Sequence, residues 1–249
     1  MGSMKTILII GANSDIAKEC ALIWAGQGHN LILTSRDLDQ LNHQADILNQ
    51  QGAGSVKVFS FDVTVLSALE DLVRMCYESF ASIDLVFIAH GVLLKSDCDE
   101  AKELKSLEKF LNVNGMSTIL LIRRFINEFI RFNQGHIAVL SSIAGDRARP
   151  SNLEYGLSKQ MVSFYMEGLR KESYEAGITL TLIKPGLIRT KMTEHLPDGM
   201  LFTSSKSAAK SIVSAIEAKK FEVYVPAYWR LISIILRLIP FKILSRLNV

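Results

Sequence analysis

Residues 5–17 read KTILIIGANSDIA, and they give the clearest indication of the fold class. The apolar run Ile7–Ile10 ends at Gly11, and apolar residues with helical spacing begin at Ile16. A short apolar run bounded by glycine predicts a buried strand, and the spacing after it predicts a helix over 15–27. A strand that turns directly into a helix presents unpaired amide groups and the positive end of the helix dipole, which suit a phosphate.

The alternation of strand and helix continues along the chain. Further strands are predicted at 31–34, 56–61, 85–89, 136–140, 178–183 and 222–225, and helices at 38–48, 62–77, 152–174 and in two segments within 99–132. Apolar strands separated by helices indicate a parallel sheet covered on both faces. We therefore predict an α/β fold of the Rossmann type, doubly wound, with a mainly parallel seven-stranded sheet and helices on both faces. Ligands of such a fold bind beyond the carboxyl ends of the strands.

Length and charge narrow the class of protein. The 249 residues suit one large domain, which we place at 4–226, followed by a tail at 227–249. Lys and Arg number 28 against 25 Asp and Glu, and this balance argues against nucleic-acid binding. The scattered cysteines Cys20, Cys76 and Cys98 favour a reducing compartment and no metal site. No stretch has the roughly 20 apolar residues that span a bilayer, so a cytoplasmic location is expected.

The turn after the first strand holds the first candidate cofactor residues. Gly11 permits a tight turn, and Asn13 and Ser14 can cap the helix. Asp15 and Ala17 stand where a glycine-rich fingerprint would carry glycine. An ordinary capped helix after a strand is therefore the alternative interpretation.

The end of the second strand indicates which dinucleotide is bound. Ser35 and Arg36 stand where an acidic residue would accept the ribose hydroxyls of NAD. Arg36 can pair with a 2′-phosphate and Ser35 can add a hydrogen bond, which favours NADP(H) over NAD(H). The alternative for Arg36 is a solvated surface residue. Asp62 can accept the adenine amino group or cap the helix after it.

Tyr155-Gly-Leu-Ser-Lys159 is the strongest local signal for catalysis. The two residues are four apart on a predicted helix, so they share one face, where the ammonium is expected to lower the pKa of the phenol. Ser142 follows the fifth strand and can hold a substrate oxygen, and Asn114 interrupts an apolar helix pattern and can position a water. Taken singly, these are a surface pair, a loop hydroxyl and a helix-bend residue. Their combination within this α/β pattern indicates an active site.

Together these residues resemble the short-chain dehydrogenase/reductase family over residues 5–226. In that family the residues matching Asn114, Ser142, Tyr155 and Lys159 form the catalytic tetrad. The resemblance implies that the tyrosine gives its proton to a carbonyl oxygen, the serine steadies that oxygen, and the lysine and asparagine relay the replacement proton. It implies hydride transfer between NADP(H) and a carbonyl or hydroxyl carbon.

Other motifs of the family imply further cofactor contacts. The segment beginning at Ala89 matches the family's Asn-Ala-Gly segment without its asparagine, and Pro185 begins the segment whose isoleucine and threonine touch the nicotinamide carboxamide. The resemblance also implies a homodimer or homotetramer built partly on the helix bearing Tyr155. The expected cofactor residues are Gly11, Asn13, Ser14, Asp15, Ile16, Ser35, Arg36, Asp62, Val63, Ala89, His90, Gly91, Tyr155, Lys159, Pro185, Gly186, Ile188 and Thr190.

The tail 227–249 is basic and amphipathic. Four cations are interspersed among long aliphatic residues, and no acid is present. Such a helix can lie at a membrane interface with Tyr228 and Trp229 as anchors, or pack on its domain or a dimer partner. Pro240 is expected to break it. The cations are Arg230, Arg237, Lys242 and Arg246.

The tail, the segment 144–149 and the segment 190–196 are similar to one branch of the family, the decaprenylphosphoryl-2-keto-pentose reductases. This likeness implies a polyprenyl-phosphoryl keto-sugar or another lipid-linked substrate, handled at the inner face of a membrane. Arg147 and Arg149 can meet a substrate phosphate, or belong to a solvated loop. Steroid, fatty-acyl and small-sugar carbonyls stay open as substrates, as does a non-catalytic nucleotide-binding or membrane-docked regulator.

Overall fold

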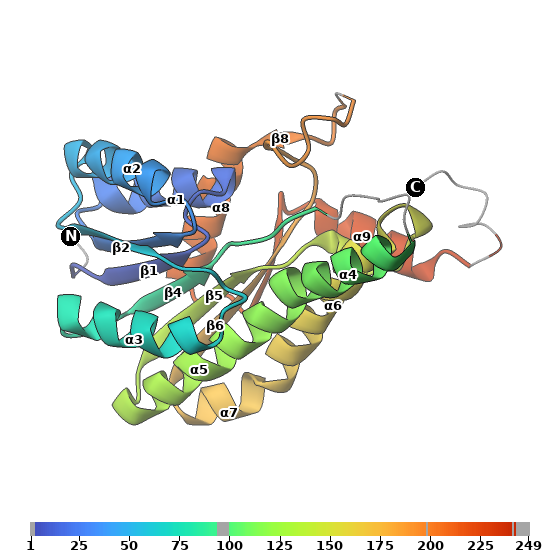
Figure 1. Cartoon of the computed structure of the whole chain (residues 1–249). Coiled ribbons are helices and arrows are strands. Elements are labelled where there is room, and N and C mark those ends of the chain that lie inside the picture. Colours follow the sequence, from blue (N-terminus) through green and yellow to red (C-terminus); the bar gives the residue numbers. More distant parts are fainter. Residues whose placement is uncertain (1–2, 94–99, 198, 241, 243–249) are drawn as a thin grey trace.

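Parallel strands form the centre of the molecule (Figure 1). The computed structural model describes residues 3–93, 100–197, 199–240 and 242. The strands of the main sheet pair in the order β3-β2-β1-β4-β5-β6-β9, and every pairing is parallel. The predicted seven-stranded doubly wound sheet is therefore confirmed. The strands are β1 (Thr6–Ile10), β2 (Asn30–Ser35), β3 (Val56–Ser60), β4 (Leu85–Ile88), β5 (Gly135–Leu140), β6 (Ile178–Pro185) and β9 (Glu222–Val225).

Helices cover both faces of the sheet, and each face has its own apolar core (Figure 1). One face carries α1 (Asp15–Gly26), α2 (Leu38–Gln51) and α8 (Ser205–Glu217). The other carries α3 (Ser67–Ser79), α5 (Ser117–Phe132) and α6 (Leu153–Gly168). The remaining helices are α4 (Glu100–Leu111), α7 (Arg170–Glu175) and α9 (Trp229–Leu238).

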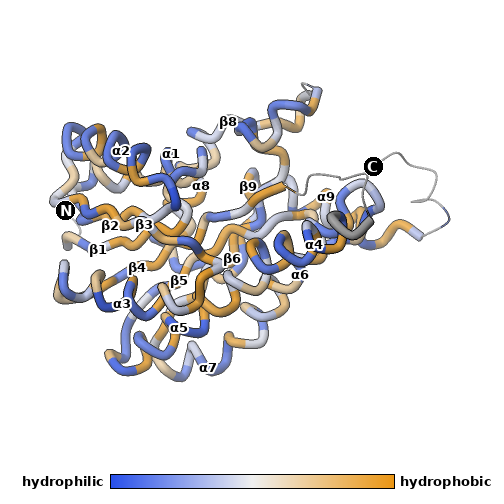
Figure 2. Tube along the Cα trace, viewed as in Figure 1, coloured by the Kyte–Doolittle hydropathy of each residue, from blue (hydrophilic) through white to orange (hydrophobic). Residues whose placement is uncertain are grey.

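Alternation within the first strand explains the two cores. Ile7 and Ile9 point into one core, and Leu8 and Ile10 point into the other. A strand buried on both faces has no polar side, and Figure 2 shows the central strands coloured mainly as hydrophobic. The order of the strands reverses between β1 and β4, which is where a doubly wound sheet opens a crevice for ligands.

The structure corrects the predicted helix at 62–77. That helix, α3, begins at Ser67 instead, because the Asp62 carboxylate accepts hydrogen bonds from Thr64, through its amide at 2.9 Å and its hydroxyl at 2.7 Å. This local turn competes with helix formation. Asp62 is therefore not the cap of α3. The long helix predicted at 152–174 is divided at Leu169 into α6 and α7.

The sequence prediction lacked the helix α8 and two short strands. The helix α8 has the apolar spacing Ala208, Ile212, Ile216, so the signal for it was present. The pair β7 (Ile188–Arg189) and β8 (Thr203–Ser204) is too short to leave a periodic pattern, because each strand has two residues.

Candidate active site

The turn between β1 and α1 is built for close approach. Gly11 has φ +83°, and a Cβ there would lie 2.5 Å from the backbone nitrogen of His90. Only glycine fits this position. Ser14 caps α1, because its hydroxyl accepts a hydrogen bond from the amide of Ala17 at 3.2 Å. The first amides of α1 have no carbonyl partner inside the helix, and this positive end of the helix would suit an anion.

Asp15 has a contact that its sequence position did not reveal. Its carboxylate accepts a hydrogen bond from the backbone amide of Lys191 at 2.7 Å. The acid that replaces a glycine of the fingerprint therefore ties the phosphate turn to the segment after β7. That segment contributes Lys191, Met192 and Thr193 to the site, and sequence reasoning did not list these three.

A cavity of about 620 Å³ lies over the carboxyl ends of β1, β2 and β3. Arg36 is exposed at its edge, and the Ser35 hydroxyl accepts a hydrogen bond from the Asn13 amide at 2.6 Å. Hydrogen bonds from Thr64, together with the nearby charge of Arg36, lower the pKa of Asp62. The predicted cofactor residues that line it are Gly11, Asn13, Ser14, Ser35, Arg36, Asp62, Val63, His90 and Gly91.

A second cavity, of about 310 Å³, holds the predicted catalytic hydroxyls. It shares Asn13, Ser14, His90 and Gly91 with the first, so the two form one continuous groove. Among the predicted residues it adds Asp15, Ile16, Ala89, Ser142, Tyr155, Lys159, Pro185, Gly186, Ile188 and Thr190.

Lys159 lies buried in the wall of the second cavity. Its Nζ donates a hydrogen bond to the carbonyl of Leu140 at 3.1 Å and lies 5.8 Å from the centroid of the Tyr155 ring. Burial lowers the pKa of Lys159 to about 8. The pKa of the ammonium therefore lies close to neutral pH. The group sits at the end of β5, beside the phenol that it was predicted to assist.

The expected lowering of the pKa of Tyr155 by Lys159 is wrong for this state of the protein. Burial raises the pKa of the phenol, and a hydrogen bond with Ser142 only partly opposes it. Desolvation of the phenolate, which disfavours the charged form, is thus the dominant effect on this pKa. A tyrosine that keeps its proton is suited to donate it to a substrate oxygen.

Asn114 lies behind the groove instead of lining it. It sits in a π-helical turn, Asn112–Met116, between α4 and α5. Its Oδ1 accepts a hydrogen bond from the Val92 amide at 2.9 Å, and its Nδ2 donates to the Val92 carbonyl at 3.0 Å. The side chain therefore fixes the chain after β4. Its role in holding a water stays a prediction.

His90 follows Ala89, which stands where the family's Asn-Ala-Gly segment carries its asparagine. Its Nε2 lies 3.0 Å from the Val113 carbonyl and 2.9 Å from the Ser117 hydroxyl. Burial and the charge of Lys159 lower the pKa of His90 to about 3, so the ring is neutral. The histidine therefore joins the end of β4 to the start of α5.

The helix α9 packs directly against the Pro185–Gly186 segment. A Cβ on Gly186 would lie 2.1 Å from the indole Nε1 of Trp229, so the ring covers the glycine backbone. Trp229 is buried, and the sequence-based expectation that it anchors a membrane interface is wrong. The tail helix thus supports the wall of the catalytic cavity.

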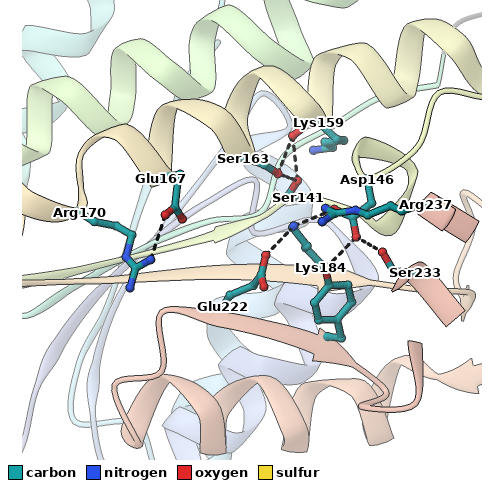
Figure 3. Close-up of polar contacts among 11 residues, drawn as sticks. Ser141, Asp146, Lys159, Ser163, Glu167, Arg170, Lys184, Glu222, Ser233 and Arg237 are labelled. Atoms are coloured by element: carbon teal, nitrogen blue, oxygen red, sulfur yellow. Dashed lines mark hydrogen bonds and ion pairs between the residues drawn. The ribbon is translucent and has the colours of Figure 1, made fainter. Parts of the chain in front are cut away.

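A buried carboxylate holds α9 in place (Figure 3). Asp146 follows the turn after Ser142 and accepts hydrogen bonds from Lys184 at 2.7 Å, Tyr224 at 2.8 Å and Arg237 at 2.8 Å. It also accepts one from the Ser233 hydroxyl. The residues come from β6, β9 and α9, so one acid joins the tail to the loop that carries Ser142.

Arg147 also binds α9. Its guanidinium donates to the carbonyls of Arg237 at 3.4 Å and Ile239 at 3.2 Å, at the carboxyl end of α9. A cation there is favoured by the helix dipole. The expectation that Arg147 meets a substrate phosphate is therefore replaced by a capping role. Arg149 is half-buried and makes no hydrogen bond or ion pair with the described residues.

The groove and its hydroxyls define a dinucleotide-dependent oxidoreductase, and comparison with known proteins supplies the family. The profile of the short chain dehydrogenase family matches residues 5–201. The chain belongs to this family and is an NAD(P)-dependent oxidoreductase acting on CH–OH groups.

Relatives and solved structures agree with this assignment. An uncharacterized oxidoreductase of Staphylococcus epidermidis is 29% identical over 212 residues, covering 85% of this chain and 89% of the relative. One of Listeria monocytogenes is 31% identical and covers 78% of each chain. A short-chain dehydrogenase from Sphingobium yanoikuyae in complex with NADPH superposes with a TM-score of 0.79 at 22% identity, covering 98% of this chain and 97% of the other.

Replacing Lys159 by methionine is expected to stabilise the fold while removing activity. The folded-state pKa of about 8 lies below the usual 10.5, so the buried ammonium costs as much as about 3 kcal/mol at neutral pH. Between these two values the unfolded chain binds the proton more tightly, so wild-type stability rises with pH. Urea denaturation should show the largest gain for Lys159→Met at neutral pH and a shrinking gain above pH about 8. An equal gain at all pH values would contradict this.

Proposed function

We propose that the protein reduces a carbonyl group with NADP(H), the substrate lying in the cavity that holds Ser142 and Tyr155. The carrying observation is the continuous groove, which runs from Arg36 at one end to Tyr155 at the other. The groove therefore connects a site for the 2′-phosphate with a site for the reacting carbon.

The residues of the groove fit a dinucleotide. Asn13 Oδ1 and His90 Nδ1 are buried and have no hydrogen-bond partner in the part of the chain that the structure describes. Both residues line the groove. Gly11 lets the turn pack closely on the backbone of His90, and the amino-terminal turn of α1 would hold the pyrophosphate. Ile188 and Thr190 would hold the nicotinamide end. When bound, the nicotinamide supplies or accepts the hydride.

The proton chemistry belongs to the chain itself. Tyr155, with its raised pKa, donates its proton to the carbonyl oxygen while the Ser142 hydroxyl holds that oxygen. Lys159, whose pKa is about 8, can return a proton to the phenolate, since its own proton is only loosely held. Asn114 keeps the segment after β4 in place through Val92.

The preference for NADP(H) rests on Arg36. It lies at the edge of the groove, close enough to influence the pKa of Asp62, and no described acid forms an ion pair with it. Arg36→Ala is expected to weaken NADPH binding about tenfold or more, because hydrogen bonds to charged groups contribute about 1.5–3 kcal/mol. NADH binding should change little. Titration of both cofactors by fluorescence or calorimetry checks this prediction. Equal affinity of the wild type for both cofactors would contradict the preference for NADP(H).

The substrate that we propose has a large apolar part. The class that we favour is a polyprenyl-phosphoryl keto-sugar or another lipid-linked carbonyl. The cavity wall supports an apolar substrate. Beyond it, Leu196, Met200 and Leu201 are exposed on the segment between β7 and β8. Arg149 is the remaining candidate for a substrate phosphate. The apolar residues that line the cavity are Ile16, Ala89, Leu140, Pro185, Ile188 and Met192.

We also propose that the protein is a homodimer or homotetramer that works at the inner face of a membrane. Exposed Leu153, Leu157 and Phe164 on α6 and Leu120 on α5 support an interface between copies. Steroid, fatty-acyl and small-sugar carbonyls are the alternative substrates. A regulator without turnover is the alternative of another class, and assays of a carbonyl panel with NADPH distinguish it.

A further inference from the structure

The helix α9 is turned with its polar side toward the protein. Ser233 and Arg237 are one turn apart, and both donate to the buried Asp146. Trp229, one turn earlier, is buried against Gly186. The inward face is therefore held by an ion pair, a hydroxyl and one indole ring. This arrangement is opposite to that of an ordinary surface helix, which buries its aliphatic side.

The aliphatic side of α9 faces outward. Leu231, Ile234, Ile235 and Leu238 follow the spacing i, i+3, i+4, i+7, which places them on one face. Their exposed fractions are 63%, 47%, 51% and 76%. Four large aliphatic side chains exposed in one row mark an interaction surface, whereas isolated exposed residues do not. We call these four residues the outer face of α9.

Charge around the outer face selects the kind of partner. Residues 223–249 contain four cations and no acid. Arg230 is exposed on α9 and makes no ion pair with the described residues. Arg237 keeps about half of its side chain exposed although it binds Asp146. An aliphatic row bordered by cations complements a surface that is apolar inside and anionic at its edge.

We propose that the outer face of α9 lies in the headgroup region of an anionic lipid membrane. In such a position the aliphatic row enters the boundary of the acyl chains, and the cations meet lipid phosphates. A second copy of this chain fits less well. A two-fold interface on this face brings the same basic stretch of both copies together without any acid to pair with it.

The start of α9 contacts the segment that follows the cavity residues. The Tyr228 hydroxyl, at the start of α9, donates a hydrogen bond to the carbonyl of Leu201 at 3.0 Å. Leu201 and the fully exposed Met200 belong to the segment that follows the cavity residues Lys191–Thr193. A membrane against α9 therefore lies near the exposed Met200 and Leu201. Among the described residues, no helix combines the length and the hydropathy that are needed to span a bilayer.

The test is flotation of the purified protein with phosphatidylcholine vesicles that contain phosphatidylglycerol. The wild type is expected to float, and added salt should reduce binding. The double variant Leu231→Glu, Leu238→Glu should bind at least about tenfold less, since each leucine loses its apolar burial. Arg230→Gln should bind about fivefold less to these vesicles and equally to phosphatidylcholine alone.

Leu104→Glu on α4 is the matched control, because Leu104 is 64% exposed and Leu231 is 63% exposed. It should float like the wild type. Wild-type protein that stays at the bottom, or a double variant that floats equally, overturns the proposal. A double variant that changes the size of the lipid-free protein assigns the face to a second copy and also overturns it. Flotation needs no turnover, so its failure leaves the proposed reduction untouched.

Discussion

Tyr155→Phe is expected to lower kcat by about 10²–10⁴-fold, the usual contribution of a positioned general acid. The phenol is the group in the cavity whose raised pKa keeps a proton ready for a substrate oxygen, and phenylalanine removes that proton alone. Cofactor affinity should stay within a factor of a few, because the ring and the Lys159 side chain beside it remain. Single-turnover reduction and NADPH titration on the same preparation separate the two effects.

Tyr165→Phe is the matched control for this experiment. Tyr165 lies on the same helix, α6, but packs against the core that α3 and α5 share with the sheet. Loss of its hydroxyl should leave kcat unchanged. A Tyr155→Phe enzyme with wild-type kcat would refute the role of the phenol and would favour a regulator without turnover.

Asp146→Ala is expected to lower the free energy of unfolding by about 3–5 kcal/mol, the cost of leaving a buried charge without its partner. The side chains of Asp146 and Lys184 are only 2% and 4% exposed. Removal of the carboxylate leaves the Lys184 ammonium with Glu222 alone and releases the two α9 donors, Ser233 and Arg237. Chemical denaturation measures the loss. Asp71→Ala, which breaks an exposed pair with Arg74, should cost less than about 1 kcal/mol.

The loss caused by Asp146→Ala should depend on pH in a defined direction. Burial acts to raise the pKa of Asp146, but the hydrogen bonds from Lys184 and Ser233 outweigh it and lower the pKa below 3.8. A lowered folded-state pKa contributes stability that is complete above the unfolded-state value and is lost as the pH falls through the folded-state value. The difference between wild type and variant should therefore be constant near neutrality and shrink below pH about 3.8. A difference that grows on acidification would contradict the assignment.

Local patterns in the sequence were sufficient for the sheet and most of the groove. A buried strand needs apolar residues on both faces, and a tight turn needs glycine. The strand at Ile7–Ile10 and the turn at Gly11 can therefore be recognised from a few neighbouring residues. Tyr155 and Lys159 share a helix face because of their spacing. Of the expected catalytic and cofactor residues, Asn114 alone does not line either cavity. Its place behind Gly91 depends on a π-helical turn that spacing does not predict.

Contacts between distant segments were decided only by the tertiary structure. Asp15 and Lys191 are 176 positions apart, and Asp146 and Arg237 are 91 apart. No local pattern encodes which carboxylate meets which donor at such separations. The pKa of Tyr155 likewise depends on burial, which the residue types at 155 and 159 do not specify.

The tail 227–249 separates most clearly what the sequence predicts from what the tertiary structure adds. The spacing of aliphatic and basic residues is a local property, and it was enough to predict an amphipathic helix within 227–249, where the structure has α9. The pattern did not predict which side of the helix faces the protein, because an amphipathic helix can pack either its aliphatic or its polar face inward. The tertiary structure decided this, because the buried Asp146 binds Ser233 and Arg237 and so turns the aliphatic row toward the outside.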